Sequence, residues 1–300
     1  MAKPNYLIGV DGGGSKCKAI VYDIAKQTYL STGLAGPANI ALNLPKAKQA
    51  IIEACKLAIF NSGLSHLPLE QFAVGAGVAG ANDPKAKQAL LAWQQPFASL
   101  HVTTDLHIAC YGAHNSRFGA AIILGTGSCG VSITENQSQD DFLMLGGHGF
   151  KLGDKGSGAW LGLHAVQHTL EVLDELSPAS MLSQAVIEQS APDAMQIYSQ
   201  FEAANSAKFS LLAPLVFSAA DQGDALATAL LREAAYYINA MIKKLLATKP
   251  EGLTLLGGLA PLYLPWLDQT LVDQLSPAQN PPEYGAVFYA QQCQQANLKA

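Results

Sequence analysis

The stretch Tyr6–Asp23, YLIGVDGGGSKCKAIVYD, places three consecutive glycines, Gly12–Gly14, between Asp11 and the pair Ser15-Lys16. Glycines let the backbone approach a ligand closely, because they carry no side chain. The short apolar runs on both sides, bounded by polar and turn-forming residues, are typical of β-strands. The stretch therefore predicts two strands joined by a glycine turn, with an aspartate at the end of the first strand.

The turn is similar to a P-loop but differs from it in order. Gly9 and Gly14 have the spacing of G-x-x-x-x-G-K-[ST], yet Ser15 precedes Lys16, and the next residues predict a strand instead of the required helix. We therefore expect a strand-to-strand turn in which Gly12, Gly13, Gly14 and Ser15 bind phosphate through amides and a hydroxyl. We expect Asp11 to lie near these phosphates with a Mg²⁺ between them, held through water.

Two further glycine motifs match the dinucleotide fingerprint G-x-G-x-x-G, at 75–80 (GAGVAG) and 125–130 (GTGSCG). The second precedes a predicted strand, so it lacks the helix that the fingerprint requires. The first precedes a helix and is followed by Asp105 at about the distance of a ribose-binding acid, so a dinucleotide-binding oxidoreductase stays open as an alternative. The second motif, read instead as a turn GTGS, would hold the same polyphosphate as the first glycine turn.

The order of predicted elements repeats. Three strands open the chain, followed by a helix over 45–64 and further strand–helix pairs, which indicates an α/β fold with a mixed sheet. A second opening of three strands begins at Phe118 and is followed by a mostly helical region from Ser157 to Ala247. A late strand, LTLLGG, and a closing helix complete the chain. We therefore expect two related domains that face a common cleft.

Composition excludes several classes of protein. The 300 residues carry a net charge of −5 and no Lys/Arg cluster, which argues against nucleic-acid binding. The apolar runs are too short or too interrupted by glycine to span a membrane, and no signal peptide is evident, so a cytoplasmic protein is expected. The cysteines, at positions 17, 55, 110, 129 and 293, are too scattered to predict a metal site or a disulfide framework.

Seven motifs in this order resemble the sugar-kinase and actin-like ATPase superfamily: GVDGGGSKCKA, GPANIAL, AGVAGA, TTDLHIACYGAH, ILGTGSCG, GGHGFKLGDKGSGAWLG and LTLLGG. Within it, the chain resembles the N-acetylglucosamine kinase branch of the BadF/BadG-type ATPases, including bacterial glucosamine kinases. The resemblance implies two RNase H-like domains flanking a central cleft, with boundaries at 1–116 and 117–282, and a closing helix 283–300 that packs on the first domain. It also implies ATP and Mg²⁺ as cofactors.

The resemblance assigns roles to individual residues. Asp105 is implied as the catalytic base, and also as a sugar contact; from sequence alone it could instead be a helix N-cap. The implied nucleotide- and phosphate-binding residues of the second half are Gly125, Thr126, Gly127, Gly257 and Gly258. The remaining implied sugar-binding residues are Asn39, Ser128, His148 and Asp154.

Some of these roles have structural alternatives. Asn39 could be a simple turn residue after Gly36-Pro37, and Asp154 could belong to a helix cap. Mammalian N-acetylglucosamine kinases carry a tryptophan where this chain has His148. An imidazole and an indole contact an acetamido group differently, so the choice between glucosamine and N-acetylglucosamine stays open.

The expected activity is ATP-dependent phosphorylation of the 6-hydroxyl of glucosamine, N-acetylglucosamine or both. The substrate partner is a small amino sugar, with no nucleic acid or membrane, and a homodimer is compatible with the sequence. Two further functions stay open. One is an ATPase that activates an acyl-CoA dehydratase through a shared iron–sulfur cluster, which needs closely placed cysteines. The second is a non-catalytic sugar-binding regulator.

Overall fold

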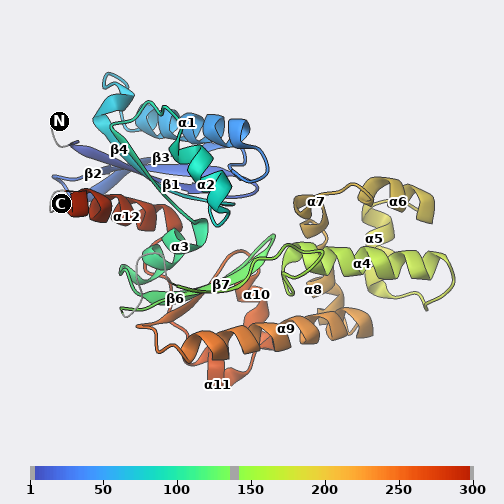
Figure 1. Cartoon of the computed structure of the whole chain (residues 1–300). Helices are drawn as coiled ribbons and strands as arrows, with labels where there is room; N and C mark the ends of the chain where they lie inside the picture. Colours follow the sequence, from blue (N-terminus) through green and yellow to red (C-terminus); the bar gives the residue numbers. More distant parts are fainter. Residues whose placement is uncertain (1–3, 136–141, 298–300) are drawn as a thin grey trace. The chain divides into compact units, whose positions relative to one another are not determined.

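The computed structural model describes residues 4–135 and 142–297 (Figure 1). Two compact units divide the chain. Unit 1 runs to Gly119 and resumes at Pro277, and unit 2 is Ala120–Ser276. Within the described ranges, no helix is long and apolar enough to cross a bilayer.

Unit 1 is built on a five-stranded sheet with the order β3-β2-β1-β4-β5. Its strands are β1 (Tyr6–Gly12), β2 (Cys17–Asp23), β3 (Thr28–Ala35), β4 (Phe72–Val78) and β5 (Ser99–Thr103). The first three form antiparallel hairpins, whereas β4 pairs parallel with β1 and β5 pairs parallel with β4. The predicted mixed sheet is confirmed.

Helices cover both faces of this sheet (Figure 1). Those of unit 1 are α1 (Leu44–Asn61), η1 (Leu69–Gln71), α2 (Pro84–Leu91), α3 (Asp105–His114) and α12 (Pro282–Asn297). A Cβ at Gly33 would overlap the backbone of α1, and a Cβ at Gly9 or Gly75 would overlap the backbone of α12. Because Gly33 and Gly9 belong to opposite faces of the pleat, α1 and α12 lie on opposite sides. The last helix of the chain thus packs directly on the first strand.

Helix α2 is shorter than the sequence predicts. The pattern AKQALLAWQQPF predicts a helix that extends to Phe97, but α2 ends at Leu91, with Ala92 as its C-cap. Pro96 disfavours helical geometry at the preceding residue, so the chain leaves the helix before it. Phe97 is then buried, 5% exposed, outside the helix.

Unit 2 has a four-stranded sheet with the order β8-β7-β6-β9. Its strands are β6 (Gly119–Leu124), β7 (Ser128–Ile133), β8 (Leu143–Gly146) and β9 (Leu253–Leu256). This order matches β3-β2-β1-β4 of unit 1, with β9 parallel to β6 as β4 is parallel to β1. The repeat seen in the sequence pattern is therefore a repeat of strand topology.

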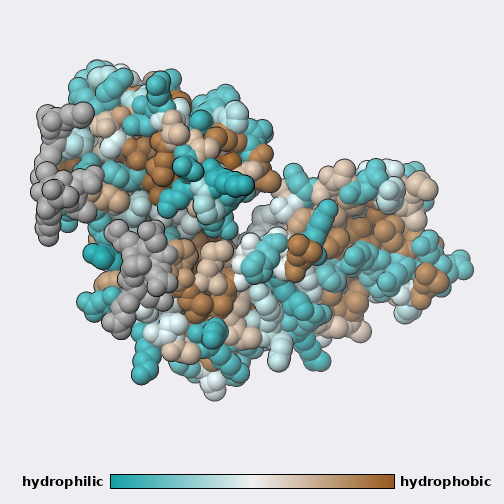
Figure 2. Space-filling view, viewed as in Figure 1, coloured by the Kyte–Doolittle hydropathy of each residue, from teal (hydrophilic) through white to brown (hydrophobic). Residues whose placement is uncertain are grey.

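The predicted helical region of unit 2 consists of several helices. They are α4 (Gly158–Leu173), α5 (Met181–Gln189), α6 (Ala194–Phe201), α7 (Ser206–Ser210), α8 (Ala213–Asp221) and α9 (Ala225–Leu246), followed beyond β9 by α10 (Ala260–Tyr263), η2 (Leu264–Trp266) and α11 (Gln269–Val272). The apolar stripe of α9, which includes Leu231, Ile238 and Leu245, is buried. Figure 2 shows apolar side chains at the surface over α4–α7, where Met195 is 71% exposed.

Candidate active site

The aspartates of unit 1 meet at one edge of its sheet. Strands β1, β4 and β5 are parallel, so their carboxyl ends lie at the same edge, and the pairing places Asp11, Gly77 and Thr103 side by side. Asp105 follows Thr103 by two residues and begins α3. Ligands of open α/β sheets bind at the carboxyl ends of strands, so this edge is the candidate site of unit 1.

The carboxylate of Asp105 does not cap helix α3. The N-cap of α3 is Thr104, whose side chain accepts a hydrogen bond from the amide of His107 at 3.0 Å. The Asp105 carboxylate accepts one bond from the amide of Leu106 at 2.9 Å. Burial raises the pKa of Asp105, while this amide lowers it. A carboxylate with a raised pKa is a better proton acceptor than a solvated one.

Asp11 lies in a crowded electrostatic environment. Burial, the largest cause, and the negative charges of Asp105 and Glu283 together raise the pKa of Asp11 to about 7, against the opposing effect of Lys16 and Lys18. The folded protein therefore holds Asp11 partly protonated near neutral pH. A cation at this position would relieve the repulsion and favour the ionised form.

The glycine turn between β1 and β2 is a tight strand-to-strand connection. The amide of Gly13 donates to the carbonyl of Lys16 at 2.9 Å, and the carbonyl of Gly13 accepts from the amide of Ala38 at 2.9 Å. Gly14 and Ser15 are exposed, and their amides have no hydrogen-bond acceptor among the residues that the structure describes. Since β2 follows, the rejection of the P-loop is confirmed.

Asn39 lies near the carboxyl end of β4, because the next residue, Ile40, donates its amide to the carbonyl of Ala79. The side-chain oxygen of Asn39 stabilises a local turn. Its Oδ1 accepts the amides of Ala41 at 3.0 Å and Leu42 at 3.1 Å. Gly80, with φ +84°, passes so close that a Cβ there would lie 2.8 Å from this oxygen. The turn interpretation is therefore correct for Oδ1, and the NH₂ group is the part of Asn39 that suits a ligand.

The dinucleotide fingerprint at 75–80 is not a strand-to-helix turn, so that alternative was wrong. Gly75 and Gly77 lie inside β4, where a Cβ would overlap Ala286 of α12 and Ile108 of α3 respectively. These glycines are required by close packing of helices on the strand and not by a bound pyrophosphate. The match at 125–130 runs into β7, as the sequence predicted.

Unit 2 also gathers its predicted turn residues at one edge of its sheet. The turn between β6 and β7 is closed by the amide of Gly125, which donates to Gly127 at 3.0 Å. The carbonyls of Gly125 and Thr126 accept amides from the first turn of α4 at 2.8 Å and 3.2 Å. The turn is therefore fixed to the start of this helix.

The second glycine turn of unit 2 lies at the same edge, because β9 runs parallel to β6. Gly257 has φ +94°, and a Cβ there would overlap the carbonyl of Leu124, which also accepts the amide of Leu259 at 3.0 Å. A Cβ at Gly258 would meet no described atom within 4 Å. A planar group could therefore approach the backbone at Gly258.

Asp154 connects two loops of unit 2. It is 7% exposed, has φ +50°, and its carboxylate accepts the amide of Gly149 at 3.1 Å. Burial raises the pKa of Asp154, and the amides of Gly149, Ser128 and His148 lower it. The carboxylate thus joins the 147–149 loop to the start of β7, an arrangement that the cap alternative did not anticipate.

The two remaining predicted sugar contacts of unit 2 differ in exposure. Ser128 is 1% exposed, and its hydroxyl donates to the carbonyl of Lys155 at 3.0 Å. His148 is exposed, in a loop whose neighbours Gly147 and Gly149 have positive φ. Of the two, His148 is the side chain that is free to meet a ligand.

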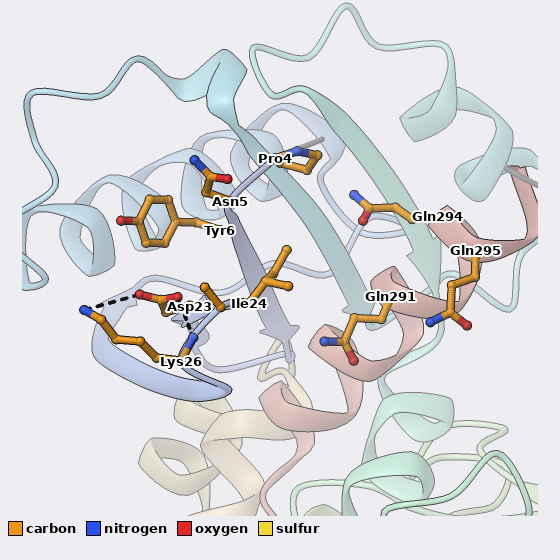
Figure 3. Close-up of a pocket in the computed structure, with 10 residues that line it drawn as sticks. Pro4, Asn5, Tyr6, Asp23, Ile24, Lys26, Gln291, Gln294 and Gln295 are labelled. Atoms are coloured by element: carbon orange, nitrogen blue, oxygen red, sulfur yellow. Dashed lines mark hydrogen bonds and ion pairs between the residues drawn. The ribbon is translucent and has the colours of Figure 1, made fainter. Parts of the chain in front are cut away.

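A cavity of about 720 Å³ in unit 1 lies at the opposite end of β1 from Asp11 (Figure 3). Its lining includes Tyr6, Asp23 and Lys26, together with glutamines of α12. None of the predicted site residues lines this cavity, so we do not assign the active site to it despite its volume.

Sequence reasoning missed two charged residues beside Asp11. The pattern predicts Lys18 only as part of a strand, and Glu283 only as the start of a closing helix. The structure pairs them in an ion pair. One feature of the sequence could have indicated Lys18. In a hairpin of β1 and β2, side chains alternate between the two faces, and this places Lys18 on the same face as Asp11.

Two sheets of one topology, each with its candidate residues at the carboxyl ends of its strands, define a two-domain actin-like ATPase fold. The chain belongs to the BadF/BadG/BcrA/BcrD ATPase family, whose model matches residues 8–284. The resemblance drawn from the sequence motifs is thereby confirmed.

Known proteins are similar over almost the whole length of the chain. A glucosamine kinase of Vibrio cholerae is 31% identical over 286 residues, covering 95% of this chain and 96% of the relative. An N-acetyl-D-glucosamine kinase of Dictyostelium discoideum is 27% identical, covering 82% of each. A crystal structure of a candidate N-acetylglucosamine kinase from Chromobacterium violaceum has a TM-score of 0.90 at 31% identity, covering 97% of this chain and 100% of that one.

Proposed function

We propose that this protein is an ATP-dependent amino-sugar kinase that transfers a phosphoryl group to the 6-hydroxyl of glucosamine or N-acetylglucosamine. The observation that carries the proposal is the similarity to a glucosamine kinase over 95% of the chain. The position of Asp105 supports it, because a half-buried carboxylate that does not cap its helix stands at the carboxyl edge of the sheet.

Asp105 is the proposed base. Phosphoryl transfer needs positioning, neutralisation of charge and a group that takes the proton of the attacking hydroxyl. The Asp105 carboxylate is held by one amide and keeps its remaining lone pairs for the sugar hydroxyl. Burial raises its pKa, which increases its affinity for the proton that leaves the hydroxyl.

Asp11 is the proposed residue for Mg²⁺, held through water. A carboxylate is a suitable ligand for this hard cation, and the crowding of Asp11 by Asp105 and Glu283 favours a positive charge beside it. No cluster of three or more ligating side chains occurs in the described ranges. The ion would therefore be held mainly by the nucleotide, and its chemistry would be to neutralise phosphate charge.

The glycine turns are the proposed phosphate and nucleoside contacts. The exposed amides of Gly14 and Ser15 would donate to phosphate oxygens from unit 1. The turn of Gly125–Gly127 and the open backbone at Gly258 would serve the nucleotide from unit 2. Asn39, His148 and Asp154 are the proposed sugar contacts.

The direct test is a coupled assay of ADP release with glucose, mannose, glucosamine and N-acetylglucosamine. We expect turnover with one or both amino sugars, and a ³¹P–¹H correlation in the product that places the phosphate on carbon 6. Turnover that prefers glucose, or a product phosphorylated elsewhere, would contradict the corresponding part of the proposal. Sugar binding without turnover would support the regulator alternative.

The alternative of a dehydratase activator finds no support in the cysteines. Cys17, Cys55 and Cys110 are buried in unit 1, Cys129 and Cys293 are half-buried, and none of the five is in a disulfide. Within the described part of the chain, they join no group of three or more His, Cys, Asp or Glu side chains that could hold a metal. Iron analysis of protein purified without oxygen tests the point, and we expect no stoichiometric iron.

A further inference from the structure

The ion pair of Lys18 and Glu283 joins the glycine hairpin to the last helix of the chain. The side chain of Glu283, in the first turn of α12, is 3% exposed, and that of Lys18, on β2, is 36% exposed. A buried carboxylate is stable only when it is paired or hydrogen-bonded. The N-terminus of α12 also favours a negative charge at Glu283. Lys18 is therefore the cation that makes this buried charge tolerable.

The pair lies beside Asp11 because of strand register. Asp11 and Lys18 are direct partners in the antiparallel β1–β2 ladder, so their side chains emerge on the same face of the sheet. Gly9 belongs to this face as well, and a Cβ there would overlap the carbonyl of Glu283. The bare backbone at Gly9 thus lets the start of α12 approach the end of β1, next to the phosphate-binding turn.

Lys18 forms an ion pair with one carboxylate, that of Glu283, and lies opposite a second, that of Asp11, in the β1–β2 ladder. Glu283 and Lys18 both act on the charge of Asp11, in opposite directions. A lysine is a flexible point charge that follows the nearest carboxylate. If Glu283 lost its charge, the ammonium of Lys18 would turn to Asp11 and neutralise it. The carboxylate of Glu283 therefore sets the position of the Lys18 ammonium group.

We propose that Glu283 is a positioning residue for the nucleotide site: it holds the Lys18 ammonium beside the glycine turn and keeps it from closing on Asp11. Helix α12, which carries Glu283, then contributes to phosphate binding by unit 1. This inference rests on the proposed function, since it assumes that Asp11 and the 13–16 turn receive MgATP.

The test compares Glu283→Gln, Lys18→Met and the double variant by calorimetric titration with MgADP. We expect each single substitution to raise Kd about tenfold and the double variant to have the same Kd as Lys18→Met, because Glu283 acts through Lys18. We expect KM for MgATP to rise in parallel, with KM for the sugar unchanged.

Asp23→Asn is the matched control. Asp23 is also a buried carboxylate, 5% exposed, that contacts a lysine, Lys26, at the far end of the same hairpin (Figure 3). We expect Asp23→Asn to lower the melting temperature and to leave Kd for MgADP unchanged. A general loss of stability in unit 1 would instead weaken binding in this variant too.

Three results would overturn the inference: a Glu283→Gln variant with Kd within twofold of the parent, losses that multiply in the double variant, or a double variant restored to the parent value. The last would mean that the pair serves stability alone. If Glu283→Gln does not fold, the double variant must match Lys18→Met, and any further loss counts against the proposal. Failure of the unmodified protein to bind MgADP would instead contradict the proposed function.

Discussion

The glycine hairpins of the two units share a topology but differ in chemistry. In unit 1, β1 ends with Asp11 and Gly12, and the turn after it exposes amides of Gly14 and Ser15. In unit 2, β6 ends with the buried Leu124, and the carbonyls of the turn are bonded to the first amides of α4. The same backbone design therefore carries charge in one unit and a fixed, uncharged turn in the other.

The acidic residues show the same contrast. Asp105 and Asp11 of unit 1 repel one another and keep free lone pairs, whereas the carboxylate of Asp154 in unit 2 is occupied by backbone amides. A carboxylate satisfied by amides contributes mainly to the shape of its loops. The proposed catalytic carboxylates are thus both in unit 1, and substitutions in each unit test whether the two units divide their roles in this way.

The largest effect is expected at the proposed base. Asp105→Asn keeps the shape of the side chain and removes its ability to accept a proton. We expect kcat to fall by about 10²–10⁴-fold with little change in stability. Asp193→Asn, at the N-cap of α6, is the control, because an asparagine caps a helix as well as an aspartate. Near-normal turnover by Asp105→Asn would remove the base assignment.

The next effect separates the two roles of Asp154. In Asp154→Ala, amides of the 147–149 loop lose their acceptor and an alanine must adopt φ +50°, so we expect a loss of about 2–4 kcal/mol. Asp154→Asn keeps an acceptor and tolerates this φ, and we expect a loss below about 1 kcal/mol. Urea unfolding measures both. If Asp154→Asn alone raises KM for the sugar strongly, the carboxylate also binds substrate.

A smaller effect concerns Asp11 and pH. The pKa of Asp11 is raised from 3.8 to about 7, so the folded state favours the protonated form, and stability falls as pH rises through this window. Without Mg²⁺ or nucleotide, we expect Asp11→Asn to unfold like the parent at pH 4 and to be more stable by about 2 kcal/mol at pH 8. This is less than the full shift implies, because Asp11 is only half-buried. Equal stability at both pH values would contradict the repulsion described above.

The smallest effect on stability is expected at His148. It is exposed in its loop, so His148→Trp should change the free energy of unfolding by less than about 0.5 kcal/mol. We expect the ratio of kcat/KM for N-acetylglucosamine to that for glucosamine to change by about tenfold, within the range that one pocket contact supplies. An unchanged ratio would place recognition of the amino group elsewhere.

Local patterns determined much of the fold. The apolar runs around the first glycine turn predicted β1 and β2, and the pattern over 45–64 predicted a helix where the structure has α1. The sequence also placed Asp105 at a strand–helix junction. These features depend on neighbours within a few residues, which a sequence displays directly.

Only the tertiary structure decided what each glycine and each charge does. Gly75 and Gly77 matched a cofactor motif, yet they serve the packing of α12 and α3 on β4. The buried pair of Lys18 and Glu283 forms because the end of the chain returns to its first strand, a contact that no local pattern specifies. Such contacts depend on which surfaces meet after the chain has folded, and so they are absent from the order of residues alone.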